Sequence, residues 1–211
     1  MEKQKVIVYV DGFNFYYGLK SISKKDTRWK KFYWLDMVLF VEKMLTDKQE
    51  LVEVNYFSAR PHDAVASKKQ DMLFCANKLN SKFRLTLGKY LKKDIICNKC
   101  GNITHSYEEK ETDVRIATQM INDVYKKRCD ITIIISADSD MIPSVELIRE
   151  IAPNHKIYVY FPPLRHSVSL SNLCDGERKL SDFKARFNQS MLPENVTLPN
   201  GTVISRPANW C

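Results

Sequence analysis

The run at 131–135, ITIII, is β-branched throughout and apolar on both faces of any strand that it forms. Strands that are buried on both faces are typical of parallel sheets with helices on either side. The rest of the chain fits that architecture, because short apolar segments alternate with segments whose apolar residues repeat at helical spacing. The sequence therefore predicts an α/β fold with a mainly parallel central sheet and helices on both faces.

The expected strands and helices take turns up to about residue 180. Strands are expected at 5–10, 51–58, 83–87, 131–136 and 156–161, and helices at 35–45, 63–79, 113–125 and 141–151. After residue 180 the pattern loosens, and VTLPNGTVI carries an Asn-Gly pair between two strand-like pieces, which is a hairpin signal. We expect one domain over 1–180, with a basic insert at 90–110 that contains CxxC, and an accessory tail over 181–211.

Acidic residues directly follow two of the predicted strands. Asp11 ends the first strand just before Gly12, and Asp138 and Asp140 follow the apolar run. In an open parallel sheet, ligands bind outside the carboxyl ends of the strands. A further acid, Asp113, opens the helix expected at 113–125 and shares its apolar stripe, so it should face the same crevice if the crossover is right-handed.

Each of these acids has a structural explanation on its own, because aspartate caps helices and Asp-Gly forms turns. Together at one edge they would repel one another and lose hydration, which a divalent cation relieves. Oxygen ligands favour Mg²⁺ or Mn²⁺, ions that can activate a water and orient a phosphodiester. The predicted metal ligands are Asp11, Asp113, Asp138 and Asp140.

The charge of the chain points to a polyanionic partner. Lysine and arginine outnumber acids by 33 to 25, which gives a formal net charge of +8, and residues 60–110 hold eleven of the basic side chains against five acids. RNA, either single-stranded or structured, is the expected partner, although a solvated lysine-rich surface has the same composition. The residues expected to bind substrate phosphates are Arg60, Lys89, Lys92, Lys93 and Lys110.

The stretch CNKCG has the spacing of half a tetrahedral zinc site, with Cys97 and Cys100 as ligands. The chain has no second Cys-x-x-Cys pair, so the other ligands would have to be brought in by the fold. A plain reduced loop and a redox pair are the competing explanations. Zinc is therefore one of three alternatives here.

Three segments, in order, resemble the signature segments of the NYN domain family, a branch of the PIN-like nucleases. They are VIVYVDGFNFYYGL, KETDVRIATQMINDVY and IIISADSDMIPSVELI. The resemblance spans roughly residues 5–180 and implies a PIN-like three-layer sandwich. It also implies a Mg²⁺- or Mn²⁺-dependent ribonuclease that leaves a 5′ phosphate, with endonucleolytic cutting favoured.

The resemblance also assigns residues. The family's acidic quartet falls on Asp11, Asp113, Asp138 and Asp140. Asn14 matches the asparagine of the first motif, where it would hold a carboxylate or a phosphate oxygen. Ser136 matches the small hydroxyl residue before the acidic pair, which we place with the substrate-binding residues. One position departs from the pattern, because many members have glycine where this chain has Glu111.

Two other functions fit part of the pattern. A non-catalytic RNA-binding module on the same fold would gain nothing from acids that face phosphates. A Mg²⁺-dependent phosphatase also places acids at strand ends, but Asp11-Gly12-Phe13 lacks the second aspartate of an aspartyl-phosphate hydrolase. With no membrane-spanning run and no apolar leader, a cytoplasmic protein without a membrane partner is expected. The oligomeric state stays open, a homodimer included.

Overall fold

The computed structural model describes residues 2–96 and 98–210; for 90–93 and 105–109 it describes the backbone alone. Within this part of the chain, six strands form one parallel sheet in the order β3-β2-β1-β6-β7-β8. The strands are β1 (Gln4–Asp11), β2 (Gln49–Ser58), β3 (Phe83–Leu87), β6 (Ile131–Ile135), β7 (Lys156–Phe161) and β8 (Gly176–Lys179). The predicted parallel α/β sheet is confirmed.

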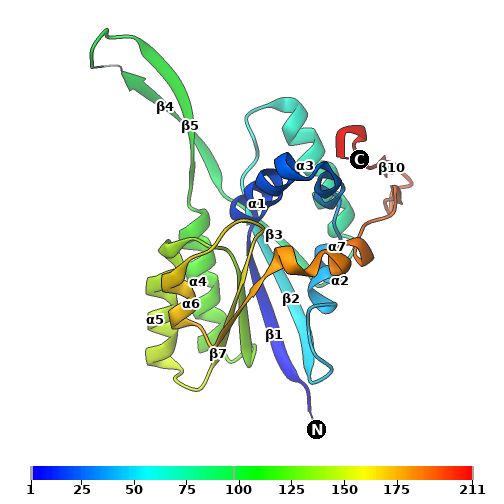
Figure 1. Cartoon of the computed structure of the whole chain (residues 1–211), viewed down its shortest axis with the longest axis vertical. Helices are drawn as coiled ribbons and strands as arrows, with labels where there is room; N and C mark the ends of the chain where they lie inside the picture. The colour runs from blue at the N-terminus through cyan, green and yellow to red at the C-terminus, as the bar shows by residue number, and fades with distance from the viewer. Residues whose placement is uncertain (1, 97, 211) are drawn as a thin grey trace.

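Helices cover both faces of this sheet (Figure 1). The first face packs against α1 (Gly12–Lys25), α2 (Met37–Glu42), α3 (Ala64–Asn77) and α7 (Lys184–Gln189), and the second against α4 (Thr112–Tyr125), α5 (Ile142–Ile151) and α6 (Val168–Leu173). Short 3₁₀ turns, η1 (Thr27–Tyr33), η2 (Ser139–Met141), η3 (Leu180–Phe183) and η4 (Ala208–Trp210), connect or end these elements. The helices and sheet together make the three layers of a sandwich.

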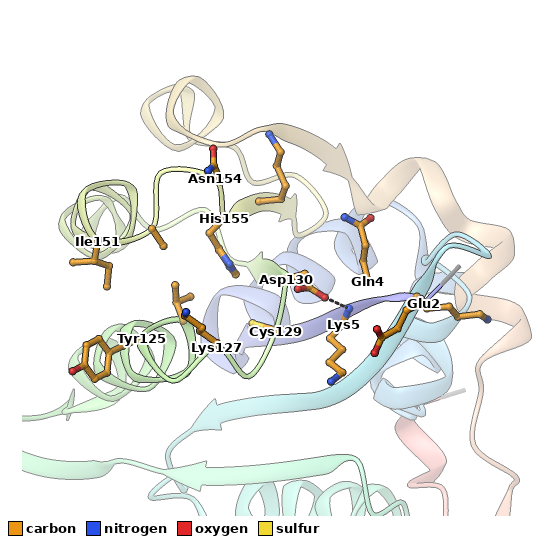
Figure 2. A pocket seen from close by; sticks show the side chains of 14 residues that line it. Glu2, Gln4, Lys5, Tyr125, Lys127, Cys129, Asp130, Ile151, Asn154 and His155 are labelled. Carbon is orange, nitrogen blue, oxygen red and sulfur yellow. Dashed lines mark hydrogen bonds between the residues drawn. The ribbon is translucent and has the colours of Figure 1, made fainter.

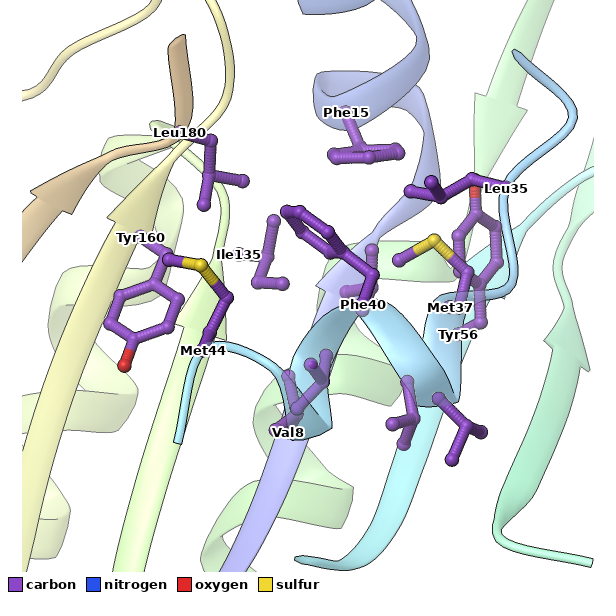
Figure 3. Packing of buried hydrophobic residues seen from close by; sticks show 14 of the residues in the cluster. Val8, Phe15, Leu35, Met37, Phe40, Met44, Tyr56, Ile135, Tyr160 and Leu180 are labelled. Atoms are coloured by element: carbon purple, nitrogen blue, oxygen red, sulfur yellow. The ribbon is translucent and has the colours of Figure 1, made fainter. Parts of the chain in front are cut away.

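Strand β1 shows why both layers form. Its successive side chains point to opposite faces, so Val8 and Val10 enter the first core while Ile7 and Tyr9 enter the second. Figure 3 shows the first core, where Val8 lies near Phe40 of α2. Because both faces of the strand are apolar, burial on both sides stabilises the sheet at roughly 25 cal/mol per Å² of apolar surface removed from water.

The helix expected at 35–45 is shorter than predicted. It runs over Met37–Glu42 and begins where the Asp36 carboxylate accepts a hydrogen bond from the backbone N–H of Leu39. Leu35 before this cap lies in an isolated bridge with Met191 instead of the first turn. The apolar residues at helical spacing therefore begin before the helix does, because the capping aspartate sets the start of the helix.

The insert predicted at 90–110 is an antiparallel hairpin that extends from the sandwich as an arm (Figure 1). It consists of β4 (Lys89–Ile96) and β5 (Ile103–Lys110). Ile95, Ile96 and Ile103 are exposed toward its far end. The arm directly precedes α4, so it leaves the body at the carboxyl edge of the sheet, where α4 begins.

The segment after residue 180 contains the predicted turn. Strands β9 (Asn195–Thr197) and β10 (Val203–Ser205) pair antiparallel, and Gly201 in the connection has φ of 82°. Phe187 of α7 is fully buried in the first core, so this segment also contributes to the core. Among the residues that the structure covers, no helix is long and apolar enough to cross a membrane.

Candidate metal centre at the carboxyl ends of the strands

Asp11 joins β1 to α1. Its Oδ1 accepts a hydrogen bond of 2.9 Å from the backbone N–H of Asn14, so the carboxylate caps α1 while it is buried at the sheet edge. The next residue must be glycine, because a Cβ on Gly12 would lie 2.5 Å from the carbonyl oxygen of Phe57. The close approach of β2 therefore fixes the backbone that aims the Asp11 carboxylate.

Ser136 connects two of the acids. Its hydroxyl donates to Asp11 Oδ2 at 2.9 Å and accepts from the backbone N–H of Asp138 at 3.0 Å. The side chain is fully buried and holds Asp11, and its assignment to the substrate-binding residues stays a prediction. Asn14 supports the same loop because its Oδ1 accepts from the N–H of Ala137 at 3.3 Å.

Asp113 reaches the site from the first turn of α4. The preceding Glu111 has φ of 78°, in the left-handed region that glycine adopts most easily, which explains why a glycine would suit this position. Glu111 is held there by ion pairs with Arg115 at 2.7 Å and with Lys89 at 3.3 Å. The loop therefore keeps its shape without the glycine.

The fold brings three of the four predicted acids together. Asp11, Asp113 and Asp138 each offer a carboxylate oxygen, and these oxygens lie within 4.8 Å of one another. Asp140 is exposed and lies outside this group, although its backbone N–H donates to Asp138 Oδ1 at 3.0 Å. We call Asp11, Asp113 and Asp138 the acidic triad.

The electrostatics of the triad are unfavourable without a cation. Burial raises the pKa of Asp11 above its usual range, and the charge of Asp138 adds to the rise against the hydrogen bonds from Asn14 and Ser136. Burial and the charges of Asp11, Asp138 and Asp140 raise the pKa of Asp113 to about 6. Within the described residues, the Asp113 carboxylate accepts no hydrogen bond. An oxygen-only set with uncompensated negative charge fits a hard divalent cation such as Mg²⁺ or Mn²⁺.

The basic residues predicted to bind phosphate lie farther apart than the acids. Arg60 forms an exposed ion pair with Asp71 at 3.1 Å, and Lys89 pairs with Glu111 beside α4. Lys110 is exposed at the end of the arm nearest α4. The side chains of Lys92 and Lys93 lie outside the described part of the structure, so their role stays a prediction.

The zinc hypothesis also stays a prediction. Cys97 lies outside the described residues, and Cys100 is an exposed free cysteine in the connection between β4 and β5. Exposure alone distinguishes none of the three alternatives for this pair.

Two hollows lie near opposite edges of the sheet. The larger, about 860 Å³, is at the amino ends of the strands and includes Lys5, Asp130 and His155 (Figure 2). The smaller, about 380 Å³, lies between α1 and α3 and includes Gly12, which directly follows Asp11. Trp210 reaches this second hollow from the far end of the chain.

Comparisons with known proteins place the chain in a family and support its fold. The family model of the NYN domain matches residues 5–181. A protein named 6-hydroxy-3-succinoylpyridine 3-monooxygenase HspA, from Pseudomonas putida (strain DSM 28022 / S16), is 26% identical, and the match covers 70% of this chain. The match covers 56% of that protein, so this chain spans about half of its length.

A solved structure shares the fold. It is a protein of unknown function from Vibrio parahaemolyticus RIMD 2210633, with a TM-score of 0.58 and 21% sequence identity. The match covers 84% of this chain and 93% of that one. At this identity the likeness supports the architecture alone.

Proposed function

Because the chain belongs to the NYN domain family, whose members are generally nucleases, we propose that it is a Mg²⁺- or Mn²⁺-dependent ribonuclease. The observation that carries the proposal is the acidic triad, with three carboxylate oxygens within 4.8 Å at the carboxyl edge of a parallel sheet. A binding module would be weakened by such charge near phosphates, whereas a hydrolase that holds a cation there gains from it.

The residues of the acidic triad have different proposed roles. When bound, the cation supplies positive charge toward the phosphate oxygens and Lewis acidity toward the attacking water. Asp11 is held by Asn14 and Ser136 and acts as a fixed ligand, and Asp138 is the second ligand. Asp113 is half-buried and accepts no hydrogen bond from described residues, so it can take the proton of the water or complete the ligand set.

The reaction that we propose is hydrolysis of the phosphodiester. The water oxygen bonds to phosphorus while the bond from phosphorus to the 3′ oxygen breaks. The proton of the water passes to Asp113 or Asp140, and the 3′ oxygen takes a proton from solvent. The downstream fragment keeps a 5′ phosphate.

A direct assay tests the proposal. Labelled RNA, single-stranded DNA and a phosphomonoester are each incubated with Mg²⁺, Mn²⁺ or a chelator, and the new RNA ends are tested for a 5′ phosphate. We expect cutting of RNA with either metal and none with chelator. Phosphate release from the monoester without RNA cutting would assign a phosphatase, and tight RNA binding with no cutting in either metal would assign a binding module.

The name of the Pseudomonas relative raises a second candidate, oxygenation of a small pyridine. The hollow beside Asp11 favours it in one respect, because the cavity is rich in aromatic side chains. Incubation with 6-hydroxy-3-succinoylpyridine, oxygen and a nicotinamide reductant tests it. Oxygen consumption that requires the pyridine, together with no RNA cutting, would replace the nuclease assignment.

A further inference from the structure

The hollow between α1 and α3 has a distinct chemical character. Its volume is about 380 Å³, and its lining combines aromatic rings with two lysines, Lys20 and Lys69. The rings come from α1, η1, β2, α3 and the C-terminal turn η4, and include Phe13, Tyr16, Tyr17, Tyr33, Tyr56 and Trp210. We call this hollow the aromatic cavity.

Part of the wall of the aromatic cavity is exposed to solvent. Tyr16 and Tyr17 are 41% and 43% exposed, although each is large and apolar. Their rings contact each other edge to face with centroids 5.3 Å apart, and the Lys20 ammonium lies 5.5 Å from the ring of Tyr17. Partly exposed aromatic side chains beside a cation suit a planar, anionic ligand, because bases stack on aromatic rings while ammonium groups attract phosphates.

The row of rings continues to the end of the chain. Tyr16 contacts Tyr33 at 5.4 Å, and Tyr33 contacts Trp210 at 5.5 Å. Trp210 thus closes the cavity from a segment that is nearly 180 residues away from Tyr33 in sequence. The arrangement requires the C-terminal turn to return to α1.

The aromatic cavity adjoins the acidic triad. Gly12 lines the cavity and directly follows Asp11, and Phe13 lines it one residue later. Tyr56 also lines it, and the charge of Asp11 adds to the burial that raises the pKa of the Tyr56 hydroxyl. A nucleotide with its phosphate at the triad would therefore have an aromatic surface on the α1 side.

The cavity also holds an unmatched hydrogen-bond acceptor. Gln70 uses its amide nitrogen to donate to Ser58 Oγ at 3.1 Å and to the carbonyl oxygen of Ala59 at 3.2 Å. Its buried Oε1 accepts no hydrogen bond from any residue that the structure describes. A buried acceptor without a donor is costly, and the N–H groups on the edge of a base would supply one.

We propose that the aromatic cavity binds one unpaired base of the strand that is cut at the triad. The inference rests on the proposed nuclease function. A base inside a duplex is stacked and paired, and could not enter the cavity without leaving the helix.

The test measures binding without cleavage. In the presence of chelator, the affinity is measured for three labelled ligands: a single-stranded RNA, its duplex, and the same strand with abasic sites. The proteins compared are the parent, Tyr17→Ala and Tyr17→Phe. Tyr125→Ala is the matched control, because Tyr125 is 75% exposed near the opposite edge of the sheet.

We expect Tyr17→Ala to weaken binding of the intact strand about tenfold, as removal of one stacking ring does. Tyr17→Phe and Tyr125→Ala should bind like the parent, and the abasic strand should bind the parent and Tyr17→Ala equally. Equal loss for the intact strand, the duplex and the abasic strand would overturn the proposal, as would no loss at all. A cavity that passes this test in a protein that cuts no RNA would refute the nuclease function and leave base binding standing.

Discussion

The two ends of β6 hold a buried hydroxyl group in opposite electrostatic settings. Beyond its carboxyl end, the Ser136 hydroxyl donates to Asp11, within a group of carboxylates that have no cationic partner among the described side chains. Near its amino end, the Thr132 hydroxyl shares a 2.8 Å hydrogen bond with His155. The nearby Asp175 is paired with Arg149 at 2.6 Å and with Lys156 at 3.0 Å.

The contrast shows which edge stores unfavourable energy. At the amino edge, burial opposes ionisation of Asp175, but hydrogen bonds from Ile157 N–H, Arg149 and Lys156 prevail and lower its pKa to about 2. At the carboxyl edge, burial and neighbouring acids raise the pKa of Asp113 to about 6. Like charges that are held together without compensation are typical of sites that bind something.

The largest expected effect is the loss of RNA cutting in Asp138→Asn. Removal of a ligand charge should lower the rate on the order of a thousandfold, because several kcal/mol of charge stabilisation is lost. The counterpart is Asp130→Asn at the amino edge, where the carboxylate accepts a hydrogen bond from the backbone N–H of Lys5. Initial rates with Mn²⁺ compare the two variants. Equal rates in the two variants would remove the triad from the chemistry.

The next effect comes from Ser136→Ala and its counterpart Thr132→Ala. Both remove a fully buried hydroxyl and should lower the free energy of unfolding by about 1 kcal/mol. Only Ser136→Ala frees Asp11, so it alone should raise the Mn²⁺ concentration needed for half-maximal activity, by about 10- to 100-fold. A metal titration of activity measures this, and Ser136→Thr should restore the parental requirement. The same shift in Thr132→Ala would mean that Ser136 has a structural role only.

The sequence predicted the features that depend on local pattern. The run at 131–135 predicted a strand that is buried on both faces, and Asp11 and Asp138 could be placed at one edge because parallel strands share their carboxyl ends. The resemblance correctly drew attention to Glu111, where the structure shows a positive φ. These inferences needed only short stretches of chain and one rule of topology.

The remaining features depend on contacts between distant residues. The hydrogen bond between Ser136 and Asp11 joins residues 125 positions apart, so the sequence could not show that the hydroxyl faces inward. Asp140 follows the same strand as Asp138 and belongs to the acidic quartet that the resemblance assigns, yet the turn η2 leaves its side chain exposed. Trp210 could not be assigned to the aromatic cavity, because no local pattern indicates that the chain end returns to Tyr33.

Without metal, replacing an aspartate should change the free energy of unfolding in opposite directions at the two edges, and by less than the effects above. Asp113→Asn removes a repelled charge and should raise the free energy of unfolding by about 1 kcal/mol after allowance for solvent screening. Asp175→Asn loses ion-pair partners and should lower it by about 1 kcal/mol. Urea unfolding in chelator measures both. Destabilisation by Asp113→Asn would show that its charge is already compensated.

Added Mn²⁺ reverses the order at the carboxyl edge. A cation that binds only the folded state stabilises it by about 2.7 kcal/mol at a hundred times its dissociation constant. The parent and Asp175→Asn should therefore gain stability with Mn²⁺, and Asp113→Asn should gain less. The same gain in all three proteins would place the cation away from the triad.

The smallest effect is a dependence of stability on pH at the amino edge, carried by His155. Burial and the charge of Arg149 lower the pKa of His155 below its usual value near 6.5, while Asp130 and Asp175 oppose the shift. Below pH 6.5 the unfolded chain therefore binds this proton more readily than the folded one, so stability falls as the pH decreases through that range. His155→Gln, which can still bond Thr132, should remove part of the loss of stability between pH 7.5 and 5.5. Urea unfolding at the two pH values measures the loss of stability. His62→Gln, at an exposed histidine, is the control. An unchanged loss in His155→Gln would assign the acid sensitivity to other groups.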